Sequence, residues 1–307
     1  MMDQRLTRTY LAVPAHRASL VRHAAASAAD AVFLDLEDAV PESEKIAALE
    51  GAASALQEVE WGRKTVSVRL NAIESPTHQE EVERLGGLPR LDAVILPKAE
   101  LLCDVTALAS RLAQAANGRT APVQIELLIE TAFGLLNVGS LAGADPAVAA
   151  LHLGVGDLAA SIGARSPGIG LSPEGYIQVG EADGAYEATP LDLFAYPMMA
   201  VLVAARAFGL RAIDGPCGAF RDMHLTSTSA RKAASMGFDG KQVIHPSQID
   251  VTRDAFVPSE AELEHARRVV AAMDSAEREG IGAVTVDGRM IDYANLRMIR
   301  RLLRFAA

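Results

Sequence analysis

Three carboxylates stand within four positions of the stretch FLDLEDAV: Asp35, Glu37 and Asp38. They come at the end of an apolar run over residues 31–34, which is typical of a buried β-strand. Carboxylates this close raise one another's pKa and destabilise a fold unless something compensates their charge. A surface loop would carry them at little cost. At the end of a strand that points into a cleft, they would instead indicate a function.

Two more carboxylates, Glu130 and Asp157, follow two later apolar runs that are neighbours in the chain. Carboxylates at adjacent strand ends can share a hard divalent cation, which offsets their repulsion. No cysteine cluster or histidine pair stands near them in the sequence, and oxygen ligands favour Mg²⁺ or Mn²⁺ over Zn²⁺. A single carboxylate at such a position would more often cap the following helix. The pair predicts a metal site.

Arg69 lies late in the apolar stretch TVSVRLN. Its planar guanidinium suits bidentate recognition of a carboxylate, so we consider it a candidate substrate contact. A structural salt bridge to Glu37 or Asp38 is the alternative interpretation, and the two roles are compatible.

Three other polar residues have more than one interpretation. Lys98, in LPKAE, suits a Schiff base or a phosphate contact, but we favour an ion pair at the strand end. His245, in IHPSQ, suits a general base, although a hydrogen-bonded structural role is commoner. Glu126 shares its strand parity with Glu130, so we expect it to point inward at a greater depth, with no chemistry assigned.

The elements that must position these residues recur along the chain. About eight short apolar runs have β-type composition, and most are separated by roughly one strand and one helix. The stretches between them, such as EKIAALEGAASALQEV and ARKAASMGF, predict amphipathic helices. The apolar runs cover residues 9–15, 31–37, 65–71, 93–99, 123–130, 150–157, 211–217 and 241–246.

This alternation of strands and helices predicts a parallel sheet. Eight such units within 307 residues favour a closed (β/α)₈ TIM barrel over an open doubly wound sheet. No G-x-G-x-x-G turn follows the first strand, which argues against a dinucleotide fold. Chemistry in these barrels lies at the C-terminal ends of the strands. We therefore expect a shared, charged cleft lined by Arg17, Glu37, Asp38, Arg69, Asn71, Lys98, Glu130, Asp157, Asp214 and His245.

Composition and charge narrow the classes of partner. Half of the residues are hydrophobic and 22% are charged, which suffices for a large core. The formal net charge of −10 argues against non-specific binding of nucleic acid and of anionic membranes. The N-terminus lacks a signal-type apolar segment, no run approaches a membrane span, and the two cysteines suit a reducing compartment. We expect a soluble cytoplasmic protein.

Two segments exceed what a barrel requires. The stretch over residues 165–189 is rich in Gly, Pro and Ser and predicts a long loop, which in a compact domain is usually functional or mobile.

After the eighth strand the chain continues, so we predict a barrel domain over residues 1–257 and an extension over 258–307. In the extension, a helix capped by Ser259 and Gly280 precedes a short β-like piece and a basic helix. The extension is either a packing helix pair or a lid or oligomer arm.

Several motifs occur in an order that covers nearly the whole chain: FLDLEDAVPESEK, VRLN, ILPKAE, LIETAFGLLN, LGVGDLAASIG, AIDGP, GFDGKQVIHPSQI and DGRMID. In this order they resemble the citrate lyase β-subunit-like family of the HpcH/HpaI aldolase/citrate lyase superfamily. The resemblance implies a TIM barrel with a C-terminal helical lid. It also implies a Mg²⁺-dependent carbon–carbon lyase that cleaves or forms a 3-hydroxy-dicarboxylic acyl-CoA such as citramalyl-CoA or malyl-CoA. The cleavage products would be acetyl-CoA and either pyruvate or glyoxylate.

The resemblance also implies roles for residues of the predicted barrel. Glu130 and Asp157 match the Mg²⁺ ligands of the family. Arg69 matches the arginine that holds the carboxylate and oxygen of the keto acid. Glu37 and Asp38 match the acidic pair that orders metal-bound water and the arginine.

Two further roles concern coenzyme A, which is part of the substrate, and the lid. Arg17 matches a contact to a CoA phosphate, and Asp292 matches an acid/base aspartate on a lid that closes over a neighbouring subunit. The lid implies a homotrimer or a dimer of trimers. The chain departs from the family pattern at Gly156, where an acidic residue is common, in DYANL, where the lid motif often runs into a proline, and in its long 165–189 segment.

Three other functions are alternative interpretations of the same residues. A malyl-CoA-type thioesterase needs only a positioned water at this site. A CoA-independent aldolase would leave Arg17 without its role. A non-catalytic binding subunit would have no need of the carboxylate pair, the arginine and Asp292.

Overall fold

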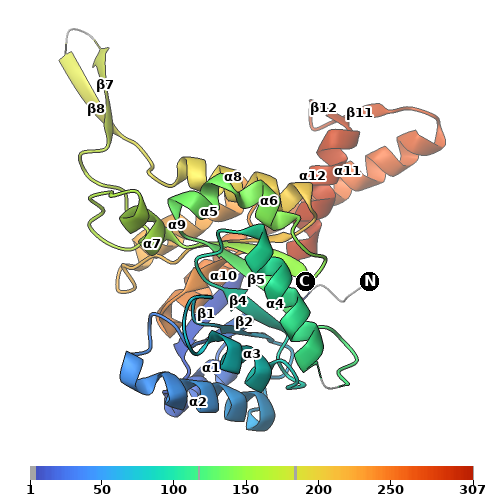
Figure 1. The fold of residues 1–307 in the computed structure, drawn as a ribbon. Helices are drawn as coiled ribbons and strands as arrows, with labels where there is room; N and C mark the ends of the chain where they lie inside the picture. Colours follow the sequence, from blue (N-terminus) through green and yellow to red (C-terminus); the bar gives the residue numbers. More distant parts are fainter. Residues whose placement is uncertain (1–4, 117, 183–184, 307) are drawn as a thin grey trace. The chain divides into compact units, whose positions relative to one another are not determined.

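The computed structural model describes residues 5–116, 118–182 and 185–306 (Figure 1). The chain folds into two compact units, the first ending at Thr252 and the second beginning at Arg253. Each unit has its own apolar core. No helix within the described ranges is long and apolar enough to cross a membrane.

The first unit is a closed barrel of eight parallel strands, as the alternation of apolar runs predicts. Each of the eight predicted runs overlaps one barrel strand. Neighbours around the barrel follow the order β1, β10, β9, β6, β5, β4, β3 and β2. The strands are β1 (Thr9–Pro14), β2 (Ala31–Asp35), β3 (Thr65–Arg69), β4 (Ala93–Leu96), β5 (Gln124–Ile129), β6 (Val148–Leu153), β9 (Arg211–Asp214) and β10 (Gly240–Val243).

Helices connect the barrel strands and lie outside them (Figure 1). Most of them bury Ala, Val and Leu on one face, as the amphipathic pattern predicts. They are α1 (Ala18–Ala26), α2 (Lys45–Glu58), α3 (His78–Leu85), α4 (Leu102–Ala115), α5 (Ala132–Leu136), α6 (Val138–Ala142), α7 (Val155–Ser161), α8 (Ala195–Ala207) and α9 (Met223–Met236). Helix α10 (Ile249–Phe256) follows the last strand, and the short 3₁₀ turns η1 (Glu42–Glu44) and η2 (Pro246–Gln248) precede α2 and α10.

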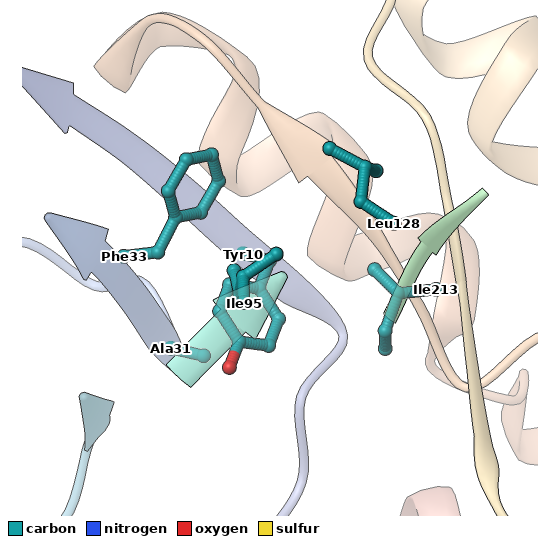
Figure 2. Packing of buried hydrophobic residues seen from close by; sticks show 6 residues of the cluster. All are labelled: Tyr10, Ala31, Phe33, Ile95, Leu128 and Ile213. Atoms are coloured by element: carbon teal, nitrogen blue, oxygen red, sulfur yellow. The ribbon is translucent and has the colours of Figure 1, made fainter. Parts of the chain in front are cut away.

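Side chains inside the barrel form three layers along its axis. Alternate residues of a strand share one face, so Glu126, Leu128 and Glu130 follow one another upward on the β5 segment. Glu126 belongs to a buried polar network, and Glu130 to the charged layer at the strand ends. Between them lies an apolar layer, which Figure 2 shows as Tyr10, Ala31, Phe33, Ile95, Leu128 and Ile213. The fold thus separates two buried carboxylates on one strand by an apolar layer.

The segment after α7 departs from the predicted loop. It contains an antiparallel hairpin, β7 (Ile177–Ala182) and β8 (Ala185–Pro190), which extends outward from the helices in Figure 1. β-Branched and aromatic residues such as Val179 and Tyr186 favour this strand pairing. The Gly, Pro and Ser residues that predicted a loop are concentrated in the approach to the hairpin.

The second unit consists of helix α11 (Glu260–Arg278), the hairpin β11 (Ala283–Val286) and β12 (Arg289–Asp292), helix α12 (Tyr293–Leu303) and the turn η3 (Arg304–Ala306). Ser259 caps α11 as predicted, in a capping box with Glu262. The C-cap is Glu279 rather than the predicted Gly280, which follows it with a φ of 74°. The core packs Val269, Met273, Val286, Ile291 and Leu296. A functional boundary after residue 257 stays a prediction.

Candidate active site

Asp35 and Arg69 form the central ion pair at the strand ends. They are register partners at the ends of β2 and β3, which makes them neighbours. Arg69 Nε donates to Asp35 Oδ1 (2.7 Å) and Arg69 Nη2 donates to Asp35 Oδ2 (2.6 Å). Burial raises the pKa of Asp35, but the charge and hydrogen bonds of Arg69 outweigh this and hold that pKa below its usual value. Asp35 therefore fixes the plane of the guanidinium.

Glu37 lies between two cations. Its Oε2 is 3.1 Å from Arg69 Nη1, and its Oε1 accepts a hydrogen bond from Lys98 Nζ. Burial raises the pKa of Glu37, and the charge of Asp38 adds to this, while Arg69 and Lys98 oppose it. Asp38 is exposed and lies 3.9 Å from each cation, beyond hydrogen-bonding distance. The three carboxylates of FLDLEDAV thus face two cations at the strand ends, rather than a surface loop.

The guanidinium of Arg69 keeps donors for a ligand. It has five N–H groups, and Asp35 and Glu37 engage three of them in the described part of the chain. Its carbon atom lies 5.7 Å from the centroid of the Phe33 ring, which belongs to the apolar layer below. The guanidinium is therefore held on two sides, and two N–H groups remain for an anionic ligand.

Glu130 lies one residue beyond β5 and is almost fully buried. Its Oε1 accepts a hydrogen bond from the backbone N–H of Lys98 (2.9 Å). A Cβ atom at position 154 would lie 2.3 Å from the Cβ of Glu130, so only glycine fits there. Burial raises the pKa of Glu130 to about 8; Arg69 opposes this, and Glu37 and Asp157 add to it. The positively charged side chains nearby, such as Arg69, therefore compensate the negative charge of Glu130 only in part.

Asp157 lies in the first turn of α7, half-buried, and close enough to Glu130 to raise the pKa of that residue. The charge of Asp157 therefore acts on Glu130, and a metal site formed by the two stays a prediction. No group of three or more His, Cys, Asp or Glu side chains with metal-binding geometry occurs among the described residues. Two carboxylates and no softer ligand suit Mg²⁺, which usually keeps several waters and takes only one or two protein carboxylates. A dication would also supply the positive charge that Glu130 lacks.

Lys98 connects the two sides of the site. Its backbone has a φ of 48°, a left-handed conformation that costs energy for a side chain other than glycine. The next residues are held by α5: Asn137 Nδ2 donates to the carbonyl of Glu100 (3.0 Å), and Gly134 packs against the carbonyl of Ala99. In this conformation the N–H of Lys98 reaches Glu130 while its Nζ reaches Glu37. The predicted ion pair of Lys98 is therefore present.

A supporting network behind Glu37 was not predicted. Lys45 Nζ donates to the carbonyls of Leu36 and Glu37 (2.8 Å each) and to Asn71 Oδ1 (2.7 Å). The backbone N–H of Asn71 donates to Glu81 Oε2 (2.8 Å). Lys45 thus ties the loop after β2 to the end of β3. The cation at the end of the motif FLDLEDAVPESEK was the available signal in the sequence.

Asp214 and His245 have structural partners. Lys241 Nζ donates to Asp214 Oδ2 (2.5 Å) and to the carbonyl of Gly215 (2.6 Å), and both charged side chains are buried. His245 Nδ1 accepts from the N–H of Ser247 (3.1 Å) and caps η2, which agrees with the structural interpretation of this residue. Neither residue is placed in the proposed chemistry.

Two further predicted site residues are Arg17, which precedes α1, and Asp292, which ends β12. Arg17 is the exposed N-cap residue of α1, three residues after the end of β1. Asp292 belongs to the second unit and is described there alone. Its Oδ1 accepts the N–H groups of Ala294 (2.8 Å) and Asn295 (3.0 Å) and so caps α12, while its Oδ2 accepts no hydrogen bond in the described part of the chain. The predicted roles of both residues stay predictions.

Comparison with known proteins identifies the family of the chain. Residues 8–246 match the HpcH/HpaI aldolase/citrate lyase family, which covers the barrel. The chain belongs to this family. A curated relative from Cereibacter sphaeroides, named L-malyl-CoA/beta-methylmalyl-CoA lyase, is 35% identical over 308 residues, covering 98% of this chain and 95% of that protein. Family membership and this similarity make the chain a carbon–carbon lyase.

Two other similarities bear on the chemistry. A second protein of Cereibacter sphaeroides, named (3S)-malyl-CoA thioesterase, is 32% identical over 296 residues, covering 96% of this chain and 93% of that protein. A crystal structure of CitE from Mycobacterium tuberculosis in complex with magnesium, acetoacetate and coenzyme A superposes with a TM-score of 0.75 at 34% identity, covering 98% of each chain. The resemblance stated from the motifs is therefore confirmed at the level of family and fold.

Proposed function

We propose that this chain is a Mg²⁺-dependent lyase that cleaves or forms a 3-hydroxy-dicarboxylic acyl-CoA, such as citramalyl-CoA or malyl-CoA. Its other reactants would be acetyl-CoA and either pyruvate or glyoxylate. One observation carries the proposal: the charges of Glu130 and Asp157 act on one another beside the guanidinium of Arg69, which keeps two N–H groups without a partner among the described residues. The relatives named for malyl-CoA chemistry and for bound magnesium and coenzyme A support it.

Arg69 would bind the keto-acid end of the substrate. Asp35 and Glu37 hold its guanidinium in one orientation, so its remaining N–H groups point in a fixed direction. Such preorganised donors stabilise negative charge at a carboxylate and at a developing ketone oxygen without reorganisation during the reaction. Glu37 and Asp38, with Lys98 beside them, would keep this guanidinium and nearby water in place.

Glu130 and Asp157 would hold Mg²⁺, with Mn²⁺ as a substitute. When bound, the metal would act as a Lewis acid that stabilises negative charge on the substrate oxygens. The hydrogen bond from Lys98 N–H fixes the orientation of Glu130, and Gly154 leaves room for its side chain.

In the cleavage direction, the bond between the carbinol carbon and the thioester α-carbon breaks. The hydroxyl proton leaves as the ketone forms, and the α-carbon gains a proton to give acetyl-CoA. We propose Asp292 as the group that exchanges this second proton, through the oxygen that does not cap α12. Arg17, exposed after β1, would bind a phosphate of coenzyme A.

We further propose that the enzyme is a cytoplasmic homotrimer or dimer of trimers that binds neither nucleic acid nor membrane. The net charge of −10 and the absence of a membrane-spanning helix from the described ranges support the last part.

Product analysis tests the activity. The protein is incubated with citramalyl-CoA and with malyl-CoA, with Mg²⁺ and with a chelator, while keto acid and free CoA thiol are followed separately. Keto acid with acetyl-CoA and no free thiol, lost on chelation, is the expected result. No product from either substrate would overturn the acyl-CoA lyase proposal and favour a CoA-independent aldolase or a binding subunit.

A thioesterase is the second candidate, because a relative that covers nearly the whole chain carries that name. It would release free thiol without keto acid in the same assay. Asp292→Asn separates the two further, since Asn caps a helix as well as Asp but cannot exchange a proton. Lyase turnover should fall with no change in melting temperature, whereas full turnover would exclude the proposed acid/base role.

A further inference from the structure

The ammonium group of Lys45, at the start of α2, is fully engaged by groups near the charged layer. An ammonium has three N–H donors and no acceptor. The Nζ atom of Lys45 donates to the carbonyls of Leu36 and Glu37 (2.8 Å each) and to Asn71 Oδ1 (2.7 Å). No donor of this ammonium is left for a ligand. Lys45 can therefore influence a bound substrate only through the groups that it holds.

Asn71 gives Lys45 a fixed partner on the side of α3. Its backbone N–H donates to Glu81 Oε2 (2.8 Å), its Nδ2 donates to Glu81 Oε1 (2.5 Å), and its carbonyl accepts from His78 Nδ1 (2.8 Å). The side chain of Thr77 also donates to Glu81 Oε1 (2.6 Å). Asn71, His78 and Glu81 are all buried. Since every polar group of Asn71 is paired, α3 fixes the oxygen to which Lys45 donates.

On its other side, Lys45 holds the loop after β2, which carries Glu37. The backbone of this loop is bound to the side chain of Asp35, whose oxygens accept the N–H groups of Glu37 (3.0 Å) and Ala39 (3.1 Å). The same two oxygens accept the two hydrogen bonds from Arg69. Glu37 Oε2 in turn lies 3.1 Å from Arg69 Nη1. Movement of this loop would therefore change the orientation of the guanidinium.

We infer that Lys45 is a positioning residue for substrate binding. Through the loop of Glu37 it fixes the direction of the two N–H groups of Arg69 that have no partner among the described residues. The inference rests on the proposed function in one respect, because it takes the carboxylate of a keto acid as the anion that Arg69 binds. Preorganised donors of this kind lose affinity and rate when their support is removed.

The proposed metal ligands are supported by other elements. Glu130 accepts from the backbone N–H of Lys98, and Asp157 lies in the first turn of α7. In the described part of the chain, the hydrogen bonds of Lys45 reach only the loop after β2 and Asn71. Loss of the ammonium should therefore weaken recognition of the keto acid while the affinity for Mg²⁺ stays unchanged.

Kinetics of Lys45→Met test this separation. The change removes the ammonium but keeps an unbranched side chain. In the condensation direction, kcat/KM for pyruvate or glyoxylate should fall by about 100-fold, the cost of a misplacement of about 1 Å at a reacting group. The KM for acetyl-CoA and the Mg²⁺ concentration that gives half of the maximal rate should not change. Lys45→Arg keeps a cation and should recover part of the loss.

Two results would overturn the inference. One is a lower melting temperature of Lys45→Met with unchanged kinetic constants for the folded protein, which is the behaviour of a purely structural lysine. The other is an equal loss of affinity for Mg²⁺ and for the keto acid.

Arg84→Met is the matched control. The side chain of Arg84, on α3, pairs with Glu50 on α2 at 2.9 Å, so it connects the same two helices as Lys45 and Glu81. This pair is exposed, and its described contacts do not include the loop after β2. Arg84→Met should therefore have the kinetic constants of the wild type.

Amide hydrogen exchange tests the positioning without substrate. In Lys45→Met the N–H groups of Glu37, Ala39 and Val40, which bond within the loop, should exchange faster, while those of β2 stay protected. Unchanged exchange in the loop would overturn the inference whatever the reaction is. Faster exchange in a protein whose wild type has no lyase turnover would refute the proposed function and leave the positioning role of Lys45 in place.

Discussion

The segment of β5 carries two buried glutamates four residues apart, and their environments are opposite. Glu126 lies in the lower polar network and Glu130 in the charged layer, with Leu128 between them. The pKa of Glu126 is lowered to about 2, although burial alone would raise it, because Arg211 and His152 compensate its charge. The pKa of Glu130 is raised to about 8 by burial, with Arg69 opposing and Glu37 and Asp157 adding to the rise.

The lower network satisfies Glu126 completely. Arg211 Nη2 donates to its Oε1 (2.7 Å), and Tyr10 Oη (2.7 Å) donates to its Oε2, with His152 Nε2 at 3.1 Å from that oxygen. His152 Nδ1 is in turn 3.0 Å from Gln242 Nε2. A network with every group paired rigidifies a core and does not need a ligand.

Glu130 receives one hydrogen bond from Lys98 N–H and shares Arg69 with Asp35 and Glu37. The pKa values of Glu126 and Glu130 therefore differ because their negative charges are compensated to different degrees. Burial does not explain the difference, since both residues are buried. A buried carboxylate whose charge the chain compensates supports the fold, whereas one left short of positive charge is suited to bind a cation.

Replacing Glu130 should have the largest effect on activity without destabilising the fold. Glu130→Gln removes a carboxylate from the proposed metal site, and we expect Mg²⁺-dependent turnover to fall about 10³-fold, which corresponds to about 4 kcal/mol in the barrier. The free energy of unfolding without Mg²⁺ should not decrease, because a neutral amide avoids burying a charge. Urea denaturation and steady-state rates check both. A large loss of stability would mean that Glu130 is already compensated.

Glu126→Gln should give the reverse result. It leaves the guanidinium of Arg211 without its carboxylate, and breaking a buried pair costs about 3 kcal/mol or more. The free energy of unfolding should fall by that amount, while folded enzyme keeps its turnover within a few-fold. If turnover in the folded variant falls as far as in Glu130→Gln, the assignment of a purely structural role to the lower network is wrong.

Lys98 tests how far a cation supports the upper layer. Lys98→Met keeps the backbone N–H that holds Glu130 but removes the charge beside Glu37. Residues that orient a first layer of ligands typically contribute 10–100-fold, so turnover or Mg²⁺ affinity should fall by about that factor. Lys98→Arg should restore part of the loss. Equal losses in Met and Arg variants would point to the strained backbone rather than the charge.

The pH dependence of stability should separate the two glutamates, with a slope of at most about 1.4 kcal/mol per pH unit for each. Glu126 has a lowered pKa, so its stabilisation is present above its usual value of 4.5 and is lost as the pH falls toward about 2. Glu130 has a raised pKa, so its ionisation costs stability as the pH rises from 4.5 to about 8 in metal-free protein.

Denaturation curves across pH, recorded with chelator, check these slopes. Glu126→Gln should flatten the dependence of the unfolding free energy on pH below about 4.5. Glu130→Gln should flatten it between about 4.5 and 8. The presence of Mg²⁺ should offset the loss on the neutral side, because the metal competes with the proton. If the unfolding free energy of Glu130→Gln still falls as the pH rises toward 8, another ionisable group must cause this dependence.

Much of the site could be predicted because it lies at strand ends. Hydrophobic periodicity gave eight strands, and parallel strands in one barrel bring their carboxyl ends to a single face. Glu37, Arg69, Glu130 and Asp157 could therefore be assigned to one cleft before any contact was known. The hairpin after α7 was missed, because glycines and prolines near it dominated the local signal.

The sequence by itself indicated about eight strands alternating with helices, and the residue types at the strand ends, because these depend on local periodicity. Only the tertiary structure decided which cation each carboxylate receives. Asp35 accepts two hydrogen bonds from Arg69. Lys45 and Lys98 hold the loop that carries Glu37. The negative charge of Glu130 is compensated only in part. The pKa of a buried group depends on partners that are distant in the chain, so the opposite pKa shifts of Glu126 and Glu130 could not be predicted, although chemistry was assigned to Glu130 alone.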